Sequence, residues 1–191
     1  HQDTPAPGQI RSSNGPMLLA LAARANAEAF DLGIARDDAA ELKAGILRGL
    51  DHDVLVMSGG VSAGVMDLIP AVLEQMGVRQ VFHHLDLKPG KPLWFGVFEQ
   101  DNHACLVFGL PGNPVSSLVC FELFVKPALT QLAGRDGTKV HRQVRAILTR
   151  DHQKRDKRLT YFPAEYRDDG AEPRVTPLPW KGSADLRTLV D

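Results

Sequence analysis

The stretch Asp53-Val54-Leu55-Val56-Met57, followed directly by Ser58-Gly59-Gly60-Val61-Ser62-Ala63-Gly64, decides the fold class of this 191-residue chain. A short apolar run that is rich in β-branched residues is typical of a strand buried on both faces of a parallel sheet. The glycines after it predict a tight turn into a helix over residues 68–76. A strand, turn and helix in this order indicate an α/β protein.

The sequence on both sides of this unit continues the alternation of helices and strands. We expect helices over residues 16–26, 39–50 and 115–132, and further strands over residues 29–34, 78–82, 93–98 and 104–110. A turn over residues 100–103 would join the last two strands as a hairpin. This order predicts a three-layer α/β sandwich with a mostly parallel sheet.

The composition changes near residue 137. Residues 140–148, 159–166 and 174–178 are short strand-like runs without a helix between them, which predicts a small β-barrel-like domain. We therefore divide the chain into a linker over residues 1–7, an α/β domain over 8–136 and a C-terminal β domain over 137–191. We expect this last domain to be incomplete.

Charge and cysteine content limit the possible partners. The chain has 22 Lys and Arg against 23 Asp and Glu, so it lacks the basic excess of a nucleic-acid or membrane-surface binder. Cys105 and Cys120 stand in apolar runs without metal-type spacing and are expected to be buried free thiols. No apolar run is expected to reach the roughly 18 residues of a membrane span. We expect a cytoplasmic protein with no nucleic-acid or membrane partner.

Three turns follow predicted strands, where ligands bind in open α/β sheets. In the first, Ser58, Gly59, Gly60 and Ser62 would let backbone N–H groups approach an anion at the start of a helix, and Asp67 would add a carboxylate. The alternative is that the glycines only make a tight turn and that Asp67 only interacts with the helix N-terminus.

The second turn is Lys88-Pro89-Gly90-Lys91-Pro92. Its prolines stiffen a backbone that carries two ammonium groups, an arrangement suited to phosphate or another oxyanion. The alternative is a solvated surface turn.

The third turn contains Pro111, Gly112, Asn113 and Ser116 and precedes the helix over residues 115–132. Backbone and hydroxyl donors there could hold a phosphate or simply cap the helix.

Two carboxylates and two histidines complete the candidate residues. Asp37 follows the predicted strand over residues 29–34, so Asp37 and Asp67 could share a divalent cation such as Mg²⁺, although Asp37 could also be an ordinary N-cap. His83 and His84 are adjacent, and on a strand they would point to opposite faces.

Three motifs together resemble one family, the molybdopterin molybdotransferases related to MoeA and the gephyrin E-domain. These motifs are Ser-Gly-Gly-Val-Ser-x-Gly-x-x-Asp over residues 58–67, Lys-Pro-Gly-Lys-Pro over 88–92 and Gly-Leu-Pro-Gly-Asn-Pro-Val-Ser over 109–116. The resemblance covers roughly residues 8–134 and continues more weakly through the C-terminal segment.

The resemblance implies a transferase of molybdenum cofactor biosynthesis with a molybdopterin-binding domain. Such an enzyme inserts molybdate into adenylylated molybdopterin with release of AMP, depends on Mg²⁺ and is a homodimer, with a molybdopterin adenylyltransferase as an expected partner. By position, Asp67, Lys88 and Asp37 would be catalytic, and Asp37 and Asp67 would hold Mg²⁺. The substrate would be bound by Ser58, Gly59, Gly60, Ser62, His84, Lys91, Pro111, Gly112, Asn113 and Ser116.

The sequence departs from the family at two points. His84 stands where some members have a lysine, and the charge of a histidine near neutral pH depends on its surroundings. Family members also carry N-terminal domains that help to close the active site, so we expect this stretch by itself to bind ligand without turnover. Two other functions stay open: adenylyl transfer to molybdopterin from ATP, and a non-catalytic binding or scaffold module.

Overall fold

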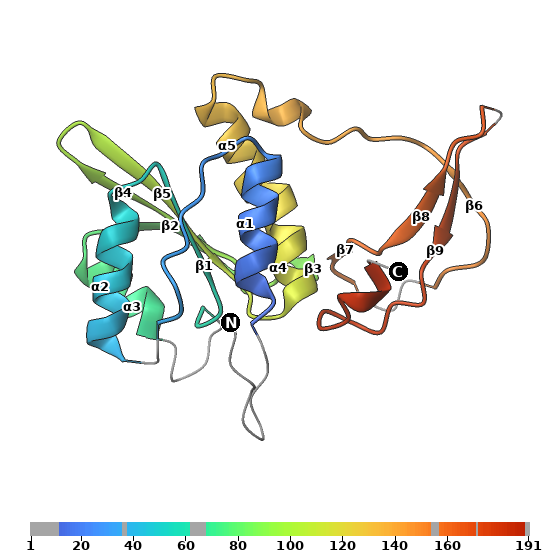
Figure 1. The fold of residues 1–191 in the computed structure, drawn as a ribbon. Coiled ribbons are helices and arrows are strands. Elements are labelled where there is room, and N and C mark those ends of the chain that lie inside the picture. The colour runs from blue at the N-terminus through green and yellow to red at the C-terminus, as the bar shows by residue number, and fades with distance from the viewer. Residues whose placement is uncertain (1–11, 36–37, 62–67, 154–156, 171, 190–191) are drawn as a thin grey trace.

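A four-stranded sheet forms the centre of the fold. The computed structural model describes residues 12–35, 38–61, 68–153, 157–170 and 172–189 (Figure 1). The strands lie in the order β1 (Val54–Ser58), β5 (His103–Leu110), β4 (Trp94–Gln100) and β2 (Arg79–His83). All four were predicted to within about two residues at either end.

The sheet is mixed, so the prediction of a mostly parallel sheet is wrong. Only β1 and β5 pair in parallel among the four described strands, whereas β4 is antiparallel to both β5 and β2. The connections explain this result. A parallel neighbour needs a long crossover, usually a helix, but β4 and β5 are joined by the tight turn at Asp101-Asn102, where Asp101 has a φ of 51°.

Helices cover both faces of the sheet, which confirms the three-layer sandwich. On one face, α2 (Ala39–Leu50) and α3 (Leu68–Gln75) pack against Leu55, Cys105 and Val107. On the other, α1 (Asn14–Arg24) and the helix that starts at Pro114 pack against a second set of sheet residues that includes Phe108 and Leu110. Residues of β5 alternate between these two clusters, as strand geometry requires. Each fully buried Leu or Phe stabilises the fold by about 1.5–3 kcal/mol.

The segment between α1 and α2 contains no strand in its described residues, so the prediction of a strand over residues 29–34 is wrong. The Asp31 carboxylate accepts a hydrogen bond from Gly33 N at 2.8 Å, and Gly33 has a φ of 86°. This local turn replaces an extended conformation. The next helix, α2, begins as predicted, because the Asp38 carboxylate accepts from the N–H groups of Ala40 and Glu41.

The longest helix runs from Pro114 to Leu132 and widens in its middle. It consists of α4 (Pro114–Cys120), the π-turn η1 (Phe121–Val125) and α5 (Lys126–Leu132). Within the π-turn, Lys126 N donates to Phe121 O. The next bond in this register would join residue 127 to Glu122 O, but Pro127 has no N–H. His141 Nε2 donates to Glu122 O instead, at 2.7 Å.

This helix also corrects the expectation that no apolar run reaches membrane-span length. It has 19 residues, and the most apolar window has a mean hydropathy of 1.3, so length and composition alone would allow it to cross a membrane. However, Val115, Cys120, Phe121 and Val125 are all buried in the fold. The helix therefore directs its apolar side into the core, and its hydropathy reflects that position.

The C-terminal segment forms an open sheet with the order β6 (Ile147–Leu148), β9 (Arg174–Pro177) and β8 (Ala164–Arg167). Along the chain, the short helix η2 (Gly137–Lys139) precedes these strands and η3 (Arg187–Leu189) follows them. The described residues form no closed barrel, so the barrel-like prediction is wrong. One strand, β7 (Leu159–Thr160), pairs outside this sheet, in parallel with β3 (Leu87–Lys88) of the α/β part.

Replacing His141 by Ala should reduce the free energy of unfolding by about 0.5–1.5 kcal/mol, because Glu122 O loses its donor. His141→Gln keeps a side-chain N–H donor and should recover part of the loss. Urea denaturation of the three proteins measures both effects. Equal stability of the wild type and His141→Ala would show that the bond contributes nothing.

Candidate functional site

One edge of the sheet collects the carboxyl ends of three strands. The pairing register places Met57 of β1, Gly109 of β5, Trp94 of β4 and His83 of β2 in one row across the sheet. Strands β1, β5 and β2 all run in the same direction, because β4 between β5 and β2 is antiparallel to both. The turns after these strands therefore meet at one edge, which is where ligands bind in open α/β sheets.

The turns after β1 and β5 lie against each other. Gly59 N donates to Leu110 O at 3.0 Å, and a Cβ placed on Gly112 would lie 3.7 Å from Gly59 Cα. Gly59 and Gly60 have φ values of 88° and 66°, and a Cβ on Gly60 would approach Ile69 Cδ1 to 2.7 Å. Glycine is thus required at residues 59 and 60 for the turn itself, and the same conformation leaves the backbone uncovered at the sheet edge.

A hydrogen-bonded chain of side chains ties α1 to this edge. Asn14 Nδ2 donates to Ser58 Oγ at 2.6 Å and to Gly112 O at 2.8 Å. Ser58 Oγ lies 3.2 Å from Ser117 Oγ, and Ser117 in turn donates to Pro111 O. The hydrogen bonds can all donate in one direction: Asn14 donates to Ser58, Ser58 donates to Ser117, and Ser117 donates to Pro111 O. Ser58 therefore links α1 to the start of α4 at this edge of the sheet.

Sequence reasoning missed Asn14, which lies at this edge. Its Oδ1 atom is buried and has no hydrogen-bond partner among the described residues. A buried acceptor without a donor is uncommon, because leaving it unpaired costs about 1–3 kcal/mol. Two sequence signals were available: its position at the start of a helix, where the residue type also suits simple capping, and its place at the end of residues 8–14, a stretch that resembles the entry to the family's central domain.

The start of α4 is covered by a residue from the C-terminal segment. Asn113 Nδ2 donates to Ser183 Oγ at 2.9 Å, and Val115 N donates to Ser183 O at 3.0 Å. The Asn113 side chain makes no capping bond to its own helix, so the simple capping role is wrong for it. Ser116 is buried, with 4% of its surface exposed. No sequence pattern could have indicated Ser183, which lies 70 residues after Asn113.

The Lys-Pro-Gly-Lys-Pro turn is held from two sides. On one side, β3 pairs with β7, and Tyr161 N donates to Lys88 O at 2.8 Å. On the other, Cys120 Sγ lies 3.7 Å from Gly90 O. Pro89 and Gly90 are buried whereas Lys91 is exposed. The backbone that carries the two lysines is therefore fixed by packing, whereas Lys91 itself lies at the surface, as the alternative of a solvated surface turn also expects.

Contrary to the prediction, His83 and His84 do not point to opposite faces of the sheet. Their rings stack with centroids 3.8 Å apart and an interplanar angle of 23°, so they do not point to opposite faces. The reason lies in the backbone, because β2 ends at His83 and His84 has a φ of 70°. His83 Nε2 donates to Val61 O at 2.8 Å, which links this strand end to the turn after β1.

The pKa of His84 is lowered from its ordinary value of 6.5, first by desolvation and then by the charges of His83 and Lys91. His84 is therefore less charged at neutral pH than a solvated histidine would be. Burial raises the pKa of Cys105 to about 11 and that of Cys120 to about 12. Both thiols stay protonated and are poor nucleophiles, as expected for buried free cysteines.

A metal site cannot be built from the described residues. Asp37, Ser62 and Asp67 lie outside them, and no group of three or more His, Cys, Asp or Glu side chains in the described part could hold a metal ion. The N-cap of α2 is Asp38, so the capping role considered for Asp37 belongs to its neighbour. Ser58, Gly59, Gly60, Gly112 and Asn113 do come together at the sheet edge.

Comparison with known proteins identifies the family. The family described as "Probable molybdopterin binding domain" matches residues 2–131. This chain belongs to that family. A molybdopterin molybdenumtransferase from Haemophilus influenzae is 39% identical over 155 residues, which cover 81% of this chain and 37% of the relative. One from Bacillus subtilis is 32% identical over 189 residues, or 97% of this chain and 42% of the relative.

Solved structures extend the likeness of this molybdopterin-binding domain to its C-terminal segment. The crystal structure titled molybdopterin biosynthesis moea protein from Pyrococcus horikosii has a TM-score of 0.77 and 32% identity, and covers 100% of this chain and 44% of its own. The tungsten cofactor synthesizing protein MoaB from Pyrococcus furiosus shares the fold, with a TM-score of 0.51 at 14% identity over 68% of this chain. The chain spans less than half the length of the curated molybdenumtransferases described above.

Gly90→Ala should distort the lysine turn. Its φ of 121° disfavours any side chain, and the new Cβ would lie 2.7 Å from Cys120 Sγ. We expect a loss of about 2 kcal/mol or more in the free energy of unfolding. Gly170→Ala is the matched control, because Gly170 also has a positive φ, 85°, but open space around its Cβ position. Equal losses in both variants would contradict the packing argument.

Replacing Lys91 by Met should raise the pKa of His84, because one of the positive charges that disfavour the imidazolium is removed. The folded-state pKa lies below the unfolded-state value, so the contribution of His84 to stability is present above pH 6.5 and is lost as the pH falls through the folded-state pKa. NMR titration of the imidazole signals measures the change. Lys43→Met on α2 is the control, and an unchanged His84 pKa in Lys91→Met would refute the assignment.

Proposed function

We propose that this chain carries the substrate-binding core of a molybdopterin molybdenumtransferase, which inserts molybdate into adenylylated molybdopterin and releases AMP in molybdenum cofactor biosynthesis. The observation that carries the proposal is the meeting of the turns after β1, β2 and β5 at one sheet edge, linked by the Gly59 N to Leu110 O and His83 Nε2 to Val61 O hydrogen bonds. Family membership supports the same substrate class.

In this proposal the sheet edge gathers anions that repel one another. The backbone of Ser58, Gly59 and Gly60 and of Pro111, Gly112 and Asn113 surrounds the substrate, with Ser62 and Ser116 as further donors. Lys88 and Lys91 supply positive charge for phosphate and molybdate oxygens, and His84 binds the substrate beside them through its imidazole ring. Fixed donors and charges of this kind act by positioning and electrostatic stabilisation and need no covalent nucleophile.

Lys88, Asp37 and Asp67 are the proposed catalytic residues, with the two carboxylates holding Mg²⁺, an ion that prefers carboxylate and phosphate oxygens. We further propose a cytoplasmic homodimer that receives its substrate from a molybdopterin adenylyltransferase. A division into an α/β unit over residues 8–136 and a C-terminal unit over 137–191 belongs to the same proposal, and residues 1–7 would be its linker.

The competing function, adenylyl transfer, is less well supported. The MoaB structure matches only 68% of this chain at 14% identity, so that likeness concerns the fold alone. The Pyrococcus horikosii structure covers 100% of the chain, including the segment that supplies Ser183 and β7. A segment that contacts two of the three motifs favours the insertion enzyme over the adenylyltransferase.

The test is AMP release by the full-length protein from adenylylated molybdopterin and molybdate. Asp67→Ala and Lys88→Ala should each lower the rate about 100-fold or more, as expected when a group that stabilises developing charge is removed. Lys43→Ala removes an equivalent charge from an exposed position on α2 and should keep the wild-type rate.

Circular dichroism of each variant should show an unchanged fold. Wild-type rates in both Asp67→Ala and Lys88→Ala would reject the catalytic assignment. Production of adenylylated molybdopterin from ATP would instead support adenylyl transfer. If the protein catalysed neither reaction, the scaffold function would be supported.

A further inference from the structure

Asn14, the first residue of α1, bridges the two glycine-containing turns of the sheet-edge site. Its Nδ2 atom donates to Ser58 Oγ at the end of β1 and to Gly112 O in the turn after β5, at 2.6 and 2.8 Å. A side-chain amide nitrogen carries two N–H groups, so both are used. Gly112 O can only accept a hydrogen bond, so the atom that faces it is the nitrogen, and the orientation of the amide is fixed.

This Asn14 bridge extends the contact between β1 and β5 into the turns that follow them. The backbone bond from Gly59 N to Leu110 O joins the ends of the two strands. Beyond it the turns stay close, since a Cβ on Gly112 would lie 3.7 Å from Gly59 Cα, but a glycine has no side chain that could hold the opposite turn in place. A side chain from α1 therefore supplies the link that the glycines cannot supply.

The same bridge sets the direction of the Ser58 hydroxyl. Ser58 Oγ accepts from Asn14, and its own proton can reach Ser117 Oγ at 3.2 Å or Pro111 O at 3.4 Å. Ser117 is fully buried and donates its proton to Pro111 O, so its oxygen is able to accept from Ser58. The Ser58 proton is therefore directed into the protein, and this turn meets a ligand with its backbone rather than with this hydroxyl.

The needs of α1 itself do not explain an asparagine at this position. The N-cap is Ser13, and Asn14 Oδ1 caps nothing, because it is buried without a hydrogen-bond partner among the described residues. Asparagine is also a weaker helix former than leucine, and an unpaired buried acceptor lowers stability. A residue that breaks local rules in this way is expected where it serves a function.

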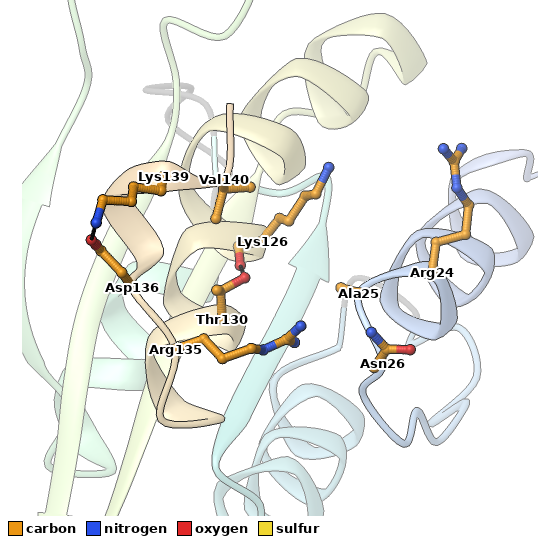
Figure 2. A pocket seen from close by; sticks show the side chains of 9 residues that line it. All are labelled: Arg24, Ala25, Asn26, Lys126, Thr130, Arg135, Asp136, Lys139 and Val140. Carbon is orange, nitrogen blue, oxygen red and sulfur yellow. Dashed lines mark hydrogen bonds and ion pairs between the residues drawn. The ribbon is translucent and has the colours of Figure 1, made fainter. Parts of the chain in front are cut away.

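The side chains at the other end of α1 do not converge. A recess of about 330 Å³ lies there, roughly 16 Å from Asn14 along the 11 residues of the helix, and the exposed side chains of Arg24, Asn26 and Arg135 are among those that line it. Arg24 points away from the other two (Figure 2). This end of α1 therefore provides a control position outside the sheet-edge site.

We propose that Asn14 is a positioning residue of the sheet-edge site, whose amide holds the turns after β1 and β5 at the separation that the substrate needs. The proposal rests on the function proposed above, in which the backbone of these turns surrounds an anionic substrate. Asn14 acts through Ser58 and Gly112 and not on the reacting atoms. Turns that are held in place beforehand lose less entropy when the substrate binds. Loss of the bridge should therefore weaken binding and leave the chemical step nearly unchanged.

The first test is hydrogen exchange of the Gly59 amide in the full-length protein without ligand. Asn14→Leu keeps the size of the side chain and favours the helix, but removes both N–H donors. The two lost hydrogen bonds should make Gly59 exchange about 10-fold faster. Asn14→Gln keeps the amide on a longer arm and should recover part of the protection. Arg24→Leu is the control at the far end of α1 and should leave Gly59 exchange unchanged.

The second test measures KM and kcat for AMP release from adenylylated molybdopterin. Asn14→Leu should raise KM about 10-fold and change kcat by less than about 2-fold, whereas partial unfolding would lower kcat and leave KM unchanged. An unchanged KM or an unchanged Gly59 exchange in Asn14→Leu would overturn the proposal. If the wild type released no AMP, the proposed function would fail, and Gly59 exchange alone would decide whether Asn14 holds the turns together.

Discussion

The parallel pairing of β1 with β5 is the interaction on which the rest of the structure depends. It aligns Ser58 with Leu110, so the two turns that follow these strands start side by side. Gly109 makes the close approach possible, because a Cβ there would lie 2.6 Å from Val61 Cγ1 and 3.2 Å from Trp94 Cβ. Val61 is consequently 1% exposed. A shift of one residue in this register would turn each side chain to the opposite face and separate the turns.

The sequence predicts the elements well where local signals decide them. The helix over residues 39–50 has its Asp38 cap, the strand over residues 53–57 has its apolar run, and the hairpin has its turn residues. The prediction of a mostly parallel sheet was wrong for a physical reason. Strand order depends on which strands pair, and a buried apolar strand has the same composition beside a parallel or an antiparallel neighbour.

In the candidate site, too, features set by the local sequence could be predicted, whereas features set by tertiary contacts could not. Its three turns could be found from glycine, proline and lysine spacing, because these residues act through the local backbone. The stacking of His83 on His84 could not, since it depends on the positive φ of a single non-glycine residue. Asn14 and Ser183 were missed because their roles come from contacts 44 and 70 residues away in the sequence. Only the tertiary structure specifies such partners.

The C-terminal segment is part of how the sheet-edge site is built. It pairs with Lys88 through β7 and bonds to Asn113 and Val115 through Ser183, so two of the three motifs have backbone or side-chain contacts with it. At the entry to this segment, His141 bonds to the carbonyl of Glu122, which Pro127 leaves without a backbone donor. The missing N–H of Pro127 leaves Glu122 O available to accept from His141, near the start of the C-terminal segment. The same segment contains β7, which pairs with β3 at the lysine motif.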